Sequence, residues 1–113
     1  MRTFIYVKTQ FAGLHCWKDA PDDIAFLRSL HRHTFHVKVT VEVTHNDRQV
    51  EYFQLKRILD GFIGMCYHEK EFEYSCEQIA ESIMRFLRNE RKFSVTSVDV
   101  NEDGDNGSIV VFE

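Results

Sequence analysis

The sequence has 113 residues, of which 43% are hydrophobic, and a formal net charge of −4. This length predicts one domain over residues 1–113, and the interspersed charges, without a basic stripe, argue against a nucleic-acid partner. No apolar run approaches the roughly 20 residues that a membrane-spanning helix needs. Three cysteines without a CxxC pair are typical of free thiols in a reducing compartment. We therefore expect a cytoplasmic protein, with no membrane partner, that binds a small molecule.

The N-terminal half of the chain has the period-two pattern of β-strands. Apolar residues from Ile5 onward share one parity with His15, so a first strand is predicted to end near that histidine. The stretch "WKDAPDDIAFLRS" then predicts a loop of about 15 residues, a length more often functional than idle. In the following "SLHRHTFHVKVTVEV", His31 and His33 lie on the same strand face as Phe35 and the valines.

The C-terminal half predicts two helices followed by two strands. "FQLKRILDGFIG" has the apolar spacing of a helix of about ten residues. In "SCEQIAESIMRFLRN", Ser75 and Gln78 form a capping-box pattern ahead of a broad apolar stripe. "FSVTSVDVNE" and "SIVVFE" read as strands joined by the turn "DGDNG". The order β, β, α, α, β, β predicts an α+β fold, a four-stranded antiparallel sheet with two helices on one face, whose other face and edges favour self-association.

Three histidines share the predicted core face of the first two strands. His31 and His33 are two residues apart on one strand, and His15 closes the neighbouring strand on the matching face. Neutral imidazole is a common zinc ligand, and catalytic zinc keeps three protein ligands and one open position. The alternative is three separately hydrogen-bonded, partly buried histidines. His36 and His45 lie off this face, and we expect them to be solvated.

Four segments together resemble one enzyme family. "FAGLH", "LHRHTFHVKVTVEV", "SCEQIAESI" and "VDVNE" are similar, in the same order, to the FxxxH, HGHNY, TSEN and VxVxE segments of the 6-pyruvoyltetrahydropterin synthase and 6-carboxytetrahydropterin synthase family. The resemblance implies the tunnelling fold, in which trimers close a β-barrel and two trimers stack as a hexamer. It also implies a Zn²⁺ ion held by His15, His31 and His33.

The resemblance implies further site residues around a pterin. Glu102 would clasp the amino-pyrimidine edge of the ligand, because one carboxylate can accept two parallel N–H bonds. Ser75 and Glu77 match the helix start that lies near the ligand, although capping alone explains Ser75. Ligand sites would lie at subunit boundaries, where the histidines of one chain face Glu102 of another.

The sequence departs from the family at the residues that move protons. The family's catalytic cysteine corresponds to Leu27, and its catalytic aspartate corresponds to Tyr67. Leucine can neither donate nor accept a proton. Three residues are candidate replacements: His68 acting with a zinc-bound water, Cys76 at the helix start, and Cys16, which is expected to point away from the zinc face. The alternative for each cysteine is a buried, inert thiol.

Two functions of different class follow from these observations, so enzyme activity stays an open question here. The first is a zinc-dependent lyase that acts on 7,8-dihydroneopterin triphosphate or a related pterin, in a queuosine-type or biopterin-type pathway, with His68 moving a proton. The second is a non-catalytic zinc protein that binds or sequesters a pterin, purine or nucleotide-like ligand. The histidine set and the resemblance favour the lyase, whereas Leu27 favours the binding protein. The expected function is the lyase, with the binding protein as the alternative.

Overall fold

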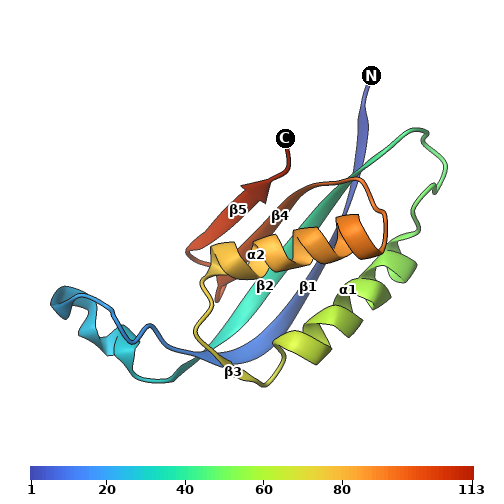
Figure 1. The fold of residues 1–113 in the computed structure, drawn as a ribbon. Coiled ribbons are helices and arrows are strands. Elements are labelled where there is room, and N and C mark those ends of the chain that lie inside the picture. The colour runs from blue at the N-terminus through green and yellow to red at the C-terminus, as the bar shows by residue number, and fades with distance from the viewer.

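The computed structural model describes residues 1–113 and has helices on one face of a curled sheet (Figure 1). In chain order the elements are β1 (Thr3–His15), η1 (Asp22–Arg28), β2 (His31–Val43), α1 (Tyr52–Cys66), β3 (Glu71–Phe72), α2 (Cys76–Arg85), η2 (Phe86–Glu90), β4 (Val95–Glu102) and β5 (Gly107–Val111). The strand order is β3-β1-β2-β4-β5. The predicted α+β fold is confirmed. None of the helices combines the length and the apolarity needed to cross a membrane.

The core lies between the sheet and the two long helices. β1 and β2 are antiparallel over their whole length, which pairs Val7 with Val39 and Phe11 with Phe35. The rings of Phe11 and Phe35 stack with centroids 5.0 Å apart. The helices contribute fully buried side chains to the same cluster, namely Leu55, Leu59, Ile79, Ile83 and Leu87. The alternating apolar residues of the strands therefore face the helices, as their parity predicts.

Both long helices begin at a side-chain cap. Ser75 and Gln78 form the predicted capping box at the start of α2. At the start of α1 the carboxylate of Glu51 accepts the backbone N–H groups of Phe53 and Gln54, a cap that the sequence pattern did not indicate. α1 has 15 residues rather than about ten, because the helix continues beyond its last fully buried residue, Ile63, to a C-cap at Tyr67.

The sheet contains a fifth strand that the sequence analysis missed. β3 has two residues and pairs in parallel with the end of β1. The N–H of Leu14 donates to the carbonyl of Lys70 (3.1 Å), and the N–H of Cys16 donates to that of Phe72 (3.3 Å). A strand of two residues is too short to show the alternation of apolar and polar side chains. Only its hydrogen bonds to β1 identify it as a strand. The sheet is therefore mixed rather than wholly antiparallel.

The segment between β1 and β2 projects from one end of the sheet (Figure 1) and is not a featureless loop. It contains the 3₁₀ helix η1, and the N–H of Trp17 donates to the carbonyl of Leu27 (2.7 Å) across its base. The Nε–H of Arg28 donates to the carbonyl of Ala20 (2.8 Å). These bonds close the segment on itself and hold Leu27 beside the end of β1.

The sheet face opposite the helices carries exposed apolar side chains on two separate strands, β1 and β5. Phe4 and Tyr6 of β1 and Ile109 and Val111 of β5 are between 43% and 66% exposed. Thr40 and Ser97, which separate Tyr6 from Val111 across the sheet, are polar. An open sheet face and open edges of this kind favour contact with another chain.

We expect the purified protein to form trimers or hexamers through this sheet, as the family resemblance implies. Ile109→Asp should lower the mass measured by light scattering at micromolar concentration, because it places a charge on the apolar patch. Met65→Asp, which changes an equally exposed apolar residue on α1, is the matched control. A wild-type protein that scatters as a monomer would contradict the prediction.

Candidate metal and ligand site

The strand register gathers the three predicted histidines into one cluster. His15 lies directly opposite His31, and His33 lies opposite Gly13, one pair further along the same face. One nitrogen from each ring lies within 4.8 Å of the other two. A Cβ at Gly13 would come within 2.9 Å of the Phe72 ring, so the absence of a side chain there leaves room for the rings around it. The structure thus brings together the residues that the sequence analysis assigned to a metal.

Two of the three rings in this cluster have a buried nitrogen without a hydrogen-bond partner. The Nε2 atoms of His15 and His31 are buried and unpartnered. Buried polar atoms are nearly always satisfied, and an unpaired one costs free energy. Burial lowers the pKa of His15 against the opposing attraction of Glu102, so its imidazole is neutral at neutral pH. Three imidazoles that converge on one point form a donor set that fits a zinc ion.

Hydrogen bonds behind two of the rings select the tautomer that a metal requires. Nδ1 of His31 lies 2.8 Å from the carbonyl oxygen of Ser29, and because a carbonyl only accepts, this nitrogen carries the proton. Nδ1 of His33 lies 2.6 Å from Oδ2 of Asp103. In both rings the lone pair is consequently on Nε2, which faces the cluster.

Asp103 was not among the residues that the sequence analysis selected. It follows β4 with a φ of +58°, and its Oδ1 accepts the N–H of Thr34 (2.8 Å). The hydrogen bonds from His33 and Thr34 lower the pKa of Asp103, so that the carboxylate is ionised. Its only signal in the sequence is its position next to Glu102 in an acidic turn, which predicts a turn and nothing more.

Glu102 lies against the histidines of its own chain. Its Oε2 is 2.9 Å from Nε2 of His15 and 3.4 Å from Nε2 of His33. The shorter contact lacks hydrogen-bond geometry, so Nε2 of His15 still counts as unpartnered. The histidines thus face Glu102 of the same chain, whereas the sequence analysis expected them to face Glu102 of another chain. The reason is the β2–β4 register, which pairs Glu102 with Phe35, two residues beyond His33.

A cleft of about 500 Å³ adjoins the cluster. Ser75, Glu77 and Glu102, the predicted ligand-binding residues, all line it. Trp17 and Tyr74 line it as well and were missed, because single aromatic residues in loops carry no pattern. The structure thus places the helix start, the end of β4 and the loop after β1 around one space.

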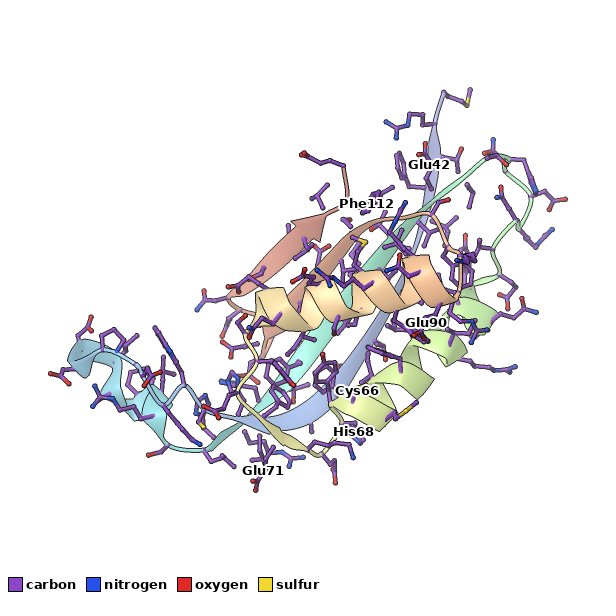
Figure 2. All side chains as sticks on the ribbon, viewed as in Figure 1. Glu42, Cys66, His68, Glu71, Glu90 and Phe112 are labelled. Carbon is purple, nitrogen blue, oxygen red and sulfur yellow. The ribbon has the colours of Figure 1, made fainter.

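Of the three candidate proton-transfer residues, the two cysteines line the cleft and the histidine does not. Cys76 lines the cleft, but burial, together with Glu102 and Glu77, raises the pKa of its thiol to about 12. Cys16 is buried and also lines the cleft instead of pointing away from it, because β1 ends one residue earlier. His68 is exposed beyond the end of α1 and does not line the cleft (Figure 2).

Leu27 and Tyr67 occupy the two positions where the resemblance places acid–base residues. Leu27 lines the cleft where the resemblance places the catalytic cysteine. Tyr67, in place of the aspartate, is buried in the core cluster, and its hydroxyl pairs with that of Ser82. Burial raises the pKa of Tyr67, so its phenol is protonated at neutral pH.

Comparison with known proteins defines the fold. No protein-family model matches the chain, and no curated protein matches it in sequence. An uncharacterized protein from Wolinella succinogenes superposes with a TM-score of 0.82 at 14% identity, covering 100% of this chain and 99% of the other. The 6-pyruvoyl tetrahydropterin synthase of Caenorhabditis elegans superposes with a TM-score of 0.74 at 11% identity, covering 100% and 97%. The chain therefore has the expected tunnelling fold of that synthase, and identities this low carry the fold alone.

We expect purified protein to contain about one zinc ion per chain, because three imidazoles converge on one point. His31→Ala and His33→Ala should each remove the ion, as measured by elemental mass spectrometry. His36→Ala and His45→Ala are matched controls, since neither residue belongs to the cluster. Wild type without zinc, or equal loss in all four variants, would rule out this site.

Asp103→Asn should lower zinc affinity by about 10- to 100-fold in a chelator competition titration. The amide oxygen can still accept the N–H of Thr34, but the amide nitrogen can only donate to Nδ1 of His33. This donor forces the His33 proton onto Nε2, which then cannot bind a metal. Asp105→Asn, in the same turn, is the control and should keep wild-type affinity. Equal affinities in the two variants would show that Asp103 does not orient His33.

Proposed function

We propose that this chain binds a zinc ion through His15, His31 and His33 and holds a pterin-like or purine-like heterocycle in the adjoining cleft. The observation that carries the proposal is the pair of buried, unpartnered Nε2 atoms in a cluster of three imidazoles. The fold shared with a pterin synthase supports the choice of heterocycle. A bound zinc ion would supply a Lewis acid for a ligand oxygen at its open position.

Glu102 is the proposed anchor for the ring. It lines the cleft beside the cluster, and its side chain is 31% exposed. A carboxylate at this place can accept two N–H groups from a guanidine-like edge. Glu77 is the second acceptor, and its Oε1 already receives the hydroxyl of Ser108. Ser75 is occupied as a helix cap, since its Oγ accepts the N–H of Gln78 (3.1 Å), so its share in ligand binding is secondary.

The geometry favours binding without turnover over lyase activity. General acid–base catalysis needs a group that exchanges protons within reach of the ligand. Leu27 has no such group, the thiol of Cys76 stays protonated, and His68 lies outside the cleft. A lyase acting on 7,8-dihydroneopterin triphosphate is the second candidate, favoured by the fold of the C. elegans synthase.

Glu102→Ala should cost about 2 to 4 kcal/mol of affinity for a pterin in calorimetric titration, because a charge-assisted paired contact is lost. His68→Ala and Glu90→Ala should leave the affinity unchanged, since neither residue lines the cleft. Zinc content should be measured in every variant, so that loss of the ligand is separated from loss of the metal.

The same proteins test the second candidate. Wild-type protein incubated with 7,8-dihydroneopterin triphosphate should yield no tetrahydropterin product. Turnover in wild type that disappears in His68→Ala would reject the binding protein and establish the lyase, because a proton-transfer group acts mainly in the transition state. Leu27→Cys places a thiol in the cleft and would report whether the remaining geometry still supports catalysis.

A further inference from the structure

We propose that the natural ligand of the cleft carries no phosphate group and is an uncharged or cationic, amino-bearing heterocycle; this inference rests on the binding function proposed above. The cleft is lined by three carboxylates, Glu73, Glu77 and Glu102, and by no lysine or arginine. Proteins bind phosphate with arginine, lysine or free backbone N–H groups. The charged side chains that line this cleft are instead negative and would repel a phosphate.

A bound zinc ion would not give the cleft a net positive charge. Its two positive charges are matched by Glu77 and Glu102, of which Glu102 already lies 2.9 Å from His15. Glu73 is paired with Lys18, whose Nζ lies 3.4 Å from its carboxylate and whose side chain is 71% exposed. With the metal in place the cleft is close to neutral, and no cation is left over for a polyphosphate.

The basic side chains on the neighbouring segments are engaged elsewhere. Arg28 at the end of η1 pairs with Asp22 at 2.7 Å. Arg32 at the start of β2 lies 3.8 Å from the carboxylate of Glu69. To reach a phosphate in the cleft, each would have to give up a carboxylate partner. Apart from Lys18, which Glu73 already neutralises, these segments therefore offer no unpaired cation to the cleft.

The start of α2 lines the cleft, and part of its capacity to bind an anion is already used. The N–H of Ser75 donates to Oε1 of Gln78 (2.9 Å), and the N–H of Gln78 donates to Oγ of Ser75 (3.1 Å). Glu77 adds a carboxylate in the first turn of the helix. A negative side chain there already complements the positive end of the helix dipole. Two of the N–H donors at this helix start are thus used by the chain itself, and a carboxylate stands beside the others.

The remaining groups suit a flat ring with N–H donors. Trp17 and Tyr74 line the cleft and are 50% and 52% exposed, so their faces are available for stacking. The carboxylates of Glu77 and Glu102 are acceptors for amino groups. A volume of about 500 Å³ lies in the usual range for a small-molecule site. An unphosphorylated pterin has the shape and the donors that these groups require.

The test compares neopterin with neopterin triphosphate on zinc-loaded, full-length protein by fluorescence titration. Neopterin should bind at least about tenfold more tightly, because the added negative charges meet like charges without a compensating cation. Added salt should narrow the difference, since it screens the repulsion.

Variants locate the cause of the difference. Glu73→Gln should raise the affinity for the triphosphate while leaving neopterin nearly unchanged, because Glu73 lines the cleft but is not one of the two proposed ring acceptors. Glu90→Gln, at the far end of the α2–η2 helix from the cleft, is the charge-matched control. Equal responses of the three proteins would contradict the assignment to the cleft carboxylates.

The outcomes separate this inference from the function on which it rests. Triphosphate that binds as tightly as neopterin, or more tightly, would overturn the inference and leave the pterin site in place. Failure of both compounds to bind would reject the proposed function itself. Tighter binding of neopterin supports both.

Discussion

The antiparallel pairing of β1 with β2, with His15 opposite His31, is the constraint on which the rest of the site depends. A shift of one residue would turn every side chain of one strand to the other face and separate His15 from its partners. The stacked rings of Phe11 and Phe35, and the paired valines beyond them, hold the register within the buried core. The free energy that positions the imidazoles therefore comes largely from apolar packing, since hydrophobic burial dominates folding.

The cleft combines a cluster of imidazoles that suits the proposed metal with poor means of proton transfer. The carbonyl of Ser29 and the carboxylate of Asp103 set the tautomers of His31 and His33. By contrast, Leu27 and the protonated thiol of Cys76 line the same space. Orientation of ligands and exchange of protons are separate requirements, and only the first is met. This division supports a protein that recognises a ligand through fixed acceptors.

The sequence predicted those parts of the fold that repeat along the chain, and it missed the parts that depend on a partner. Alternation over long strands placed His15, His31 and His33 on one face, and apolar spacing with a capping box located α2. The two-residue strand β3 carries no period, so only its hydrogen bonds to β1 reveal it. Asp103 and the intrachain position of Glu102 depend on the register of β4 against β2, which the pattern of a single strand does not encode.

Asp103 ties two structural elements to one imidazole. It lies in the turn between β4 and β5, its N–H donates to the carbonyl of Thr34 (2.7 Å), and its carboxylate holds both Thr34 and His33. If His33 binds an ion as proposed, closure of the β4–β5 hairpin and ion binding become linked equilibria, and each stabilises the other. The backbone amides of this edge hairpin would then exchange with solvent more slowly in the loaded protein, including those of β5, which holds none of the three histidines.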